Sequence, residues 1–186
     1  ITLLNAQKTG FSLSGPFYTD ADILAADMEH IWLKEWIFAA SAAELPKAGS
    51  YVTLQLGKFP VVIARGQDGV VRAFHNVCRH RASRIVDGSY GCAKKLVCPY
   101  HGWAYEKDGR LTGVPGKADY QGLNLDQLGL IPVACEVWRG FVFVQLESGG
   151  PSVAEMMAPY DHMVAPYRFE EMKAFGRVTL RHRTVN

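Results

Sequence analysis

Two short stretches of the sequence each pair one cysteine with one histidine. The first has the pattern Cys-x-His (Cys78, His80) and the second Cys-x-x-His (Cys98, His101), with 17 residues between His80 and Cys98. Four such donors can close a tetrahedral zinc site. They can also hold two irons and two sulfides, with the cysteines on one iron and the histidines on the other. The candidate metal ligands are therefore Cys78, His80, Cys98 and His101.

Short apolar runs separated by glycine-containing turns surround both stretches. Such a pattern predicts antiparallel strands joined by hairpins, and each Cys/His stretch then lies on a hairpin-like loop. We therefore expect a mainly β fold, an antiparallel β-sandwich over residues 40–147. The strands are expected at 36–40, 51–56, 59–64, 70–75, 95–97, 103–105, 110–112, 132–138 and 141–146.

The segments on either side of this region differ from it in pattern. Residues 1–18 are turn-rich and predict an extended arm, followed by an amphipathic helix over 20–35 with Thr19 as its N-cap. Gly149 and Pro151 mark a boundary, after which Ser152 is placed to cap a short helix over 153–158. Residues 175–185 have the character of a strand without a closing turn. We therefore expect the chain to be the first part of a longer protein.

Composition narrows the possible functions. The net charge of +2 argues neither for nor against binding to nucleic acid, and no basic tract is long enough to bind it, so no nucleic-acid partner is expected. The longest apolar runs are too short to span a bilayer, and the N-terminus lacks the pattern of a secretory signal. A cytoplasmic location is expected. The two cysteines outside the motif, Cys92 and Cys135, are predicted to be free thiols.

The second stretch continues as Cys98-Pro99-Tyr100-His101-Gly102-Trp103, and together the two stretches resemble the ligand motif of Rieske proteins. The resemblance is to the α-subunits of Rieske-type non-haem iron oxygenases and covers about residues 40–180. One departure is Ala82, at a position where the family often has glycine. The resemblance implies a Rieske [2Fe–2S] domain at 40–147, after an arm and helix at 1–39. Residues 148–186 would form a linker and the first part of an α+β catalytic domain.

Other Rieske proteins match less well. Those of cytochrome bc-type complexes carry an extra cysteine in each box, where this chain has Ser83 and Tyr100. They also place a serine where this chain has Trp103, whereas Tyr105 keeps the position of a tyrosine that donates a hydrogen bond to the cluster. Fewer donors near the sulfurs predict a potential at the low end of the Rieske range, roughly −150 mV. A small Rieske ferredoxin and a zinc protein stay as alternatives.

The oxygenase resemblance implies a function for the longer protein. Electrons would come from a flavin-containing reductase that uses NADH or NADPH and would pass to a mononuclear Fe(II) that activates O₂. In this family a cluster serves the iron of a neighbouring subunit in a homotrimer. The run from Cys98 to Tyr105 looks like the branch that hydroxylates or N-demethylates quaternary ammonium compounds. Aromatic ring dioxygenation is the alternative, and no residue of this chain is expected to be catalytic.

Several further residues have a structural and a functional interpretation. Arg79, Arg81 and Arg84 lie beside the candidate ligands, where they could form salt bridges with Asp87 or bind an acidic partner such as a reductase. The remaining histidines are expected to be structural or on the surface, His162 on a short helix among them. They are His30, His75, His162 and His182.

Overall fold

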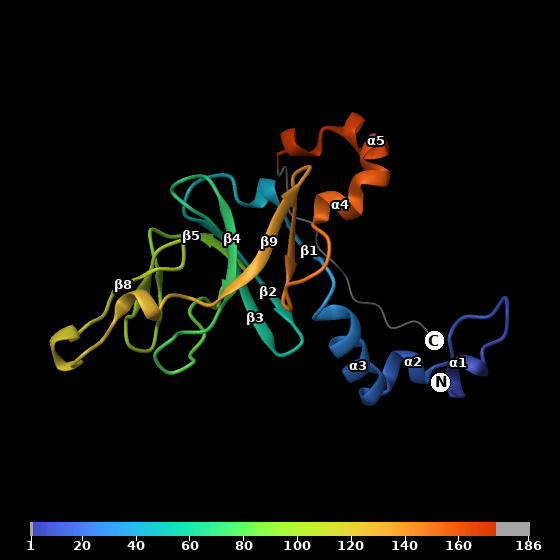
Figure 1. The fold of residues 1–186 in the computed structure, drawn as a ribbon, viewed down its shortest axis with the longest axis horizontal. Coiled ribbons are helices and arrows are strands. Elements are labelled where there is room, and N and C mark those ends of the chain that lie inside the picture. Colours follow the sequence, from blue (N-terminus) through green and yellow to red (C-terminus); the bar gives the residue numbers. More distant parts are fainter. Residues whose placement is uncertain (1, 174–186) are drawn as a thin grey trace.

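The computed structural model describes residues 2–173 of the chain. Two antiparallel sheets form its body, one of seven strands and one of three. The larger sheet has the order β1-β10-β9-β4-β3-β2-β5 and the smaller the order β6-β7-β8. In Figure 1 the smaller sheet, marked by β8, lies on the side of the larger sheet away from the N-terminal helices. The prediction of a mainly β, antiparallel fold is confirmed.

The larger sheet is built around β3, whose residues Val61, Val62, Ile63 and Ala64 are fully buried. Because side chains alternate between faces, Val61 and Ile63 enter one core cluster while Val62 enters another on the opposite face. The sheet is therefore covered on both faces. Its strands are β1 (Ile37–Ser41), β2 (Ser50–Leu56), β3 (Phe59–Arg65), β4 (Val71–His75), β5 (Tyr90–Cys92), β9 (Pro132–Trp138) and β10 (Phe141–Gln145).

The smaller sheet consists of β6 (Leu96–Val97), β7 (Ala104–Tyr105) and β8 (Leu111–Gly113). Leu96, Tyr105 and Leu111 point from it into the second core cluster, together with Val62 and Phe74 of the larger sheet. The smaller sheet is thus held by the apolar side chains that it shares with the larger one. The loop between β8 and β9, yellow in Figure 1, extends beyond it.

The strand predictions are confirmed to within one or two residues, with one omission. Residues 90–92 were expected to lie in a loop, but they form β5 at the edge of the larger sheet, where Ser50 pairs with Cys92. A three-residue strand containing Gly91 carries little strand propensity. Its formation depends on tertiary packing, since the ring of Tyr51 occupies the space that a side chain at Gly91 would need.

The N-terminal prediction is partly wrong. The arm contains two short helices, α1 (Thr2–Asn5) and α2 (Pro16–Thr19), so Thr19 ends a helix rather than capping one. The cap is Asp20, whose carboxylate accepts the backbone N–H groups of Asp22 and Ile23. The expected helix 20–35 is α3 (Ala21–Asp27), continued by a π-helical turn over Met28–Trp32. Figure 1 shows this segment to one side of the sheets.

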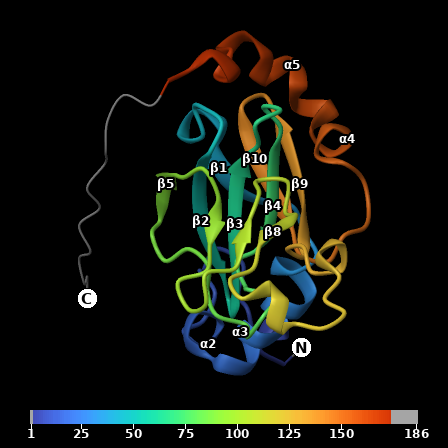
Figure 2. The ribbon, with the colours of Figure 1, turned by 90° about the vertical axis from the view of Figure 1, so that its left-hand side faces the viewer.

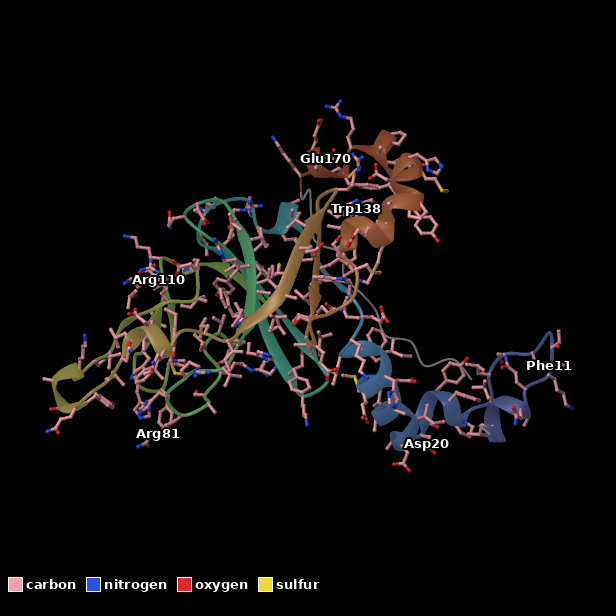
Figure 3. All side chains as sticks on the ribbon, in the orientation of Figure 1. Phe11, Asp20, Arg81, Arg110, Trp138 and Glu170 are labelled. Carbon is pink, nitrogen blue, oxygen red and sulfur yellow. The ribbon has the colours of Figure 1, made fainter. Side chains whose placement is uncertain are left out.

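The segment after β10 crosses one end of the larger sheet (Figure 2). Its helices are α4 (Val153–Met157), capped by Ser152 as predicted, and α5 (Asp161–Val164). Arg139, in the turn between β9 and β10, forms a bidentate ion pair with Asp161 and a longer contact with Glu170. Figure 3 shows Trp138 and Glu170 close together at this contact. The 3₁₀ turns within residues 2–173 are Ala42–Glu44, Lys117–Asp119, Leu125–Gln127, Ala158–Tyr160, Ala165–Tyr167 and Phe169–Glu171.

Two expectations lie outside the described residues, namely the strand at 175–185 and the role of His182. Within residues 2–173, no helix has the length and apolar character needed to cross a membrane.

The loop that carries the first Cys/His pair begins after β4 and closes in a tight turn. The Cys78 N–H donates to the Ser83 carbonyl at 2.8 Å, and the Ala82 N–H donates to the Cys78 carbonyl at 3.0 Å. Ala82 has a left-handed backbone conformation, with φ of +53°. Such a conformation is unfavourable for a residue with a Cβ atom and favours glycine.

The loop of the second pair, between β6 and β7, repeats the same turn. The Cys98 N–H donates to the Trp103 carbonyl at 2.8 Å, and the Gly102 N–H donates to the Cys98 carbonyl at 3.0 Å. Gly102 has φ of +73° and corresponds to Ala82 of the first loop. Each cysteine therefore begins a five-residue turn, and the last residue of that turn, four positions after the cysteine, has a left-handed backbone conformation.

This correspondence predicts opposite effects of two reciprocal substitutions. Ala82→Gly should stabilise the protein by up to about 1 kcal/mol. Glycine relieves the backbone strain of the folded state, and this gain in free energy exceeds the loss that comes from the greater conformational entropy of the unfolded chain. Gly102→Ala should destabilise it by about 1–2 kcal/mol, since the new Cβ would also lie 3.0 Å from Pro115. Urea unfolding at equal metal content measures both. A loss of stability in Ala82→Gly as large as in Gly102→Ala would contradict this account.

Candidate metal centre

The two cysteines of the motif are buried at the same end of the molecule. Cys78 is 3% exposed and Cys98 is 2% exposed, and both belong to the second core cluster, between the two sheets. They share this cluster with Tyr105 of β7, whose hydroxyl lies 3.3 Å from the Cys78 sulfur. The fold therefore brings together two thiols that are 20 positions apart in the sequence.

Tyr105 is oriented as a hydrogen-bond donor to the Cys78 sulfur. Its hydroxyl oxygen accepts the backbone N–H of Arg79 at 3.0 Å, which leaves its own proton free to point at the sulfur. The side chain is fully buried, and this burial, followed by the contact with Cys78, raises the pKa of the phenol well above its usual value. Tyr105 thus stays protonated, and a donor, throughout the physiological pH range.

The imidazoles of His80 and His101 lie next to each other, with ring centroids 4.6 Å apart. The indole of Trp103 stacks on His80 at 4.9 Å with only 9° between the planes. The exposed ring of Tyr100 lies over His101 at 3.8 Å. Each histidine is therefore half-buried and has one face covered by an aromatic ring.

His80 has the properties of a metal ligand. Its Nδ1 atom is buried and has no hydrogen-bond partner among the described residues, which is unusual for a buried polar atom. Burial, the neighbouring His101 and Arg81 all lower the pKa of the His80 imidazole. The ring is therefore neutral at pH 7, as binding to a metal requires.

The four candidate ligands fit a cluster of two irons. Two thiols on one side and two imidazoles on the other supply two protein donors for each iron. Within residues 2–173, no three His, Cys, Asp or Glu side chains converge closely enough to hold one metal ion. A two-iron cluster does not require such convergence, because bridging sulfides complete the coordination of each iron.

The first loop also carries three arginines next to its candidate ligands in the sequence. Arg81 and Arg84 are exposed and Arg79 is half-buried. Arg84 donates to the side-chain oxygen of Gln55 at 2.7 Å. Among the described residues, no carboxylate forms an ion pair with any of the three, so salt bridges with Asp87, one of the two alternatives for these arginines, are absent from this part of the chain. Figure 3 shows Arg81 at the end of the molecule opposite Phe11.

The described structure also places the cysteines outside the motif and two of the other histidines. Cys92 and Cys135 are free thiols, as predicted, and burial raises the pKa of Cys135 to about 11, which makes it unreactive. His162 is exposed on α5, as expected, and His30 is exposed on the π-helical turn.

Two residues near the centre were not identified from the sequence. Tyr120, on the loop between β8 and β9, approaches His80 edge-on at 6.2 Å. Asn76 is fully buried and binds the backbone of the returning part of the first loop. Asparagine is common in turns because its side chain bonds to nearby backbone groups. The position of Asn76, directly after a strand and two residues before Cys78, was a signal that could have been used.

Comparison with known proteins agrees with this geometry. Residues 35–132 match the family model described as "Rieske [2Fe-2S] domain". The chain is 40% identical to the glycine betaine monooxygenase oxygenase subunit of Pseudomonas aeruginosa. The alignment of 181 residues covers 96% of this chain and 42% of that relative. It is 33% identical to the carnitine monooxygenase oxygenase subunit of Escherichia coli, and this alignment of 150 residues covers 81% of the chain and 40% of that relative.

Solved structures give the same result. A naphthalene 1,2-dioxygenase crystal structure, of an F352V mutant bound to phenanthrene, superposes with a TM-score of 0.76 at 32% identity. The match covers 86% of this chain and 36% of that one. The chain spans about two fifths of the length of the curated relatives that it matches. The family model covers more than half of the chain and includes all four candidate ligands, and the chain therefore belongs to the Rieske [2Fe–2S] domain family.

Proposed function

We propose that this chain is the cluster-bearing part of a Rieske-type oxygenase subunit, with Cys78, His80, Cys98 and His101 as the ligands of a [2Fe–2S] cluster. When bound, the cluster supplies one-electron transfer. The observation that carries the proposal is the burial of both thiols in one core cluster together with two adjacent imidazoles, one of which has a buried Nδ1 atom without a partner among the described residues. The family match over residues 35–132 supports it independently.

The surrounding residues have definite parts in this proposal. Tyr105 donates a hydrogen bond to the Cys78 sulfur and so favours additional negative charge there. Trp103 covers one face of His80 and excludes water from it. Tyr100 covers His101 in the same way but stays exposed, which leaves His101 as the ligand nearer to solvent and to a partner protein.

The proposed substrate of the longer protein is a small quaternary ammonium compound, which would be hydroxylated or N-demethylated. The relatives at 40% and 33% identity are named for glycine betaine and carnitine, which both carry a trimethylammonium group. The likeness to naphthalene 1,2-dioxygenase keeps aromatic ring dioxygenation as the second candidate. In either case a mononuclear Fe(II) would supply the oxygen chemistry, and its ligands and the substrate contacts are assigned to no residue of this chain.

The proposed electron donor is a flavin-containing reductase that uses NADH or NADPH. The three arginines, which have no carboxylate partner in the described part of the chain, form a basic surface beside the candidate ligands, and this suits an acidic protein partner. We place the cluster domain at residues 40–147 and a linker to the catalytic domain from residue 148. A homotrimer, in which one subunit's cluster serves its neighbour, and a cytoplasmic location stay predictions.

The cluster assignment predicts the metal content. Purified protein should be coloured and contain two irons and two acid-labile sulfides per chain, and dithionite should produce the EPR signal of a reduced [2Fe–2S] cluster. A colourless protein with zinc would contradict the assignment. In the full-length protein, a third iron per chain supports the oxygenase, whereas only two would indicate an electron carrier.

The hydrogen bond from Tyr105 predicts a change in reduction potential. Tyr105→Phe should lower the potential on the order of 40 mV, because loss of a donor worth about 1 kcal/mol to the sulfur disfavours the reduced form. Potentiometric titration followed by EPR measures the shift. Tyr100→Phe is the matched control, since its ring contacts His101 but its hydroxyl has no sulfur contact among the described residues. Equal shifts in the two variants would contradict the role given to Tyr105.

A further inference from the structure

The first Cys/His loop lacks the support that the second loop has from its flanking strands. The second loop leaves β6 and returns directly into β7, and these strands pair through Leu96 with Tyr105 and Val97 with Ala104. The first loop leaves β4 but does not return into a strand, and beyond its tight turn the described residues pair across it only at the isolated bridge between Val77 and Arg84. Another interaction must therefore hold its ends together.

The side chain of Asn76 supplies this interaction. Its Oδ1 atom accepts the backbone N–H groups of Ile85 at 3.2 Å and Val86 at 3.0 Å. Its Nδ2 atom donates to the Val86 carbonyl at 2.7 Å. One amide thus replaces three hydrogen bonds that strand pairing would otherwise provide, and it is fully buried. Each backbone group that it binds would be left unsatisfied if the amide were removed.

Asn76 also connects the loop to the larger sheet. Its backbone N–H donates to the carbonyl of Pro60, in β3, at 2.8 Å. The returning residue Ile85 is 4% exposed and packs in the same core cluster as Cys78. A shift of residues 85–86 would therefore also displace Cys78, and with it His80 two positions later.

We propose that Asn76 is a positioning residue for the cluster, whose buried amide closes the first loop and so fixes Cys78 and His80. The inference rests on the proposed function, because it requires these two residues to be ligands. Asn76 itself contacts no candidate ligand by its side chain in the described structure, and acts through the backbone of residues 85 and 86. Outer residues of this kind commonly tune both the affinity for a metal group and its electronic properties.

Gln145 provides a matched control within the same chain. It is also buried, at 5% exposed, and its side-chain amide also bonds to backbone groups, those of Lys34 and Gly149. It lies in β10, next to the outer strand β1 and with its own contacts in the linker region. Its substitution should therefore remove a comparable set of hydrogen bonds without affecting the ligands.

The experiment compares Asn76→Ala, Asn76→Asp and Gln145→Ala with the wild-type holoprotein. We expect Asn76→Ala to lose its cluster to a chelator about 10- to 100-fold faster than the wild type and to shift the EPR g values of the reduced cluster. Gln145→Ala should lower the urea midpoint but leave the chelation rate and g values unchanged. Asn76→Asp keeps both acceptor contacts, and because burial favours its neutral acid, its hydroxyl can donate to the Val86 carbonyl. It should therefore show a smaller change and serves if Asn76→Ala does not fold.

The outcomes separate this inference from the proposed function. If the wild type shows no [2Fe–2S] spectrum, the ligand assignment itself is wrong. If the wild type has the spectrum but the Asn76 variants and Gln145→Ala change it equally, or none changes it, Asn76 has only a structural role and the inference is overturned. A change confined to the Asn76 variants supports it.

Discussion

The structure depends on holding two sulfur atoms and two imidazoles in fixed positions at the ends of two short loops. Each loop contains only five residues from its cysteine to the residue that closes the turn. The solution is the same in both, namely a backbone turn with a left-handed residue, Ala82 or Gly102, whose N–H donates to the carbonyl of the cysteine. The cysteines are then buried between two sheets, where Tyr105 reaches the Cys78 sulfur. The larger sheet serves as the rigid support for this arrangement.

The two loops solve the problem of closure differently. The second loop continues the pairing of β6 with β7, so its ends are held by backbone hydrogen bonds. The first loop has no such strands and uses the amide of Asn76 instead. Burying one polar side chain is favourable here because both the oxygen and the nitrogen of its carboxamide bond to backbone partners. A buried amide that satisfies the backbone gives the loop a single conformation, which a metal centre requires.

The sequence predicted the elements that depend on local pattern. The candidate ligands follow from cysteine and histidine spacing and stay a prediction, whereas the hairpins, which follow from alternating apolar residues with glycine turns between them, are present in the structure. What it did not predict depends on contacts between distant residues. The strand at Tyr90–Cys92 forms by pairing with β2, and the role of Asn76 in closing the first loop becomes visible only when the fold places residues 85 and 86 beside it.

The error at the N-terminus has a local cause. Thr19 and Asp20 are both good N-cap residues, and the sequence offers no reason to prefer one. The preceding Pro16, which is favoured at the start of a helix, begins a short helix that ends at Thr19, and Asp20 is then the cap of the next helix.

The role of the basic surface formed by Arg79, Arg81 and Arg84 was also left open by the sequence. Its arginines were expected to have either a structural or a docking role, and only the fold shows that the described carboxylates do not pair with them.

The most direct test of the central claim is to detect the histidine ligands themselves. Protein labelled with ¹⁵N only in histidine would be reduced with dithionite, and pulsed EPR would measure the nuclei coupled to the cluster. Ligation by His80 and His101 predicts two strongly coupled ¹⁵N nuclei, and His101→Cys should leave one. A reduced cluster without strong coupling to histidine nitrogen would contradict the account, and so would coupling that persists unchanged when both histidines are replaced.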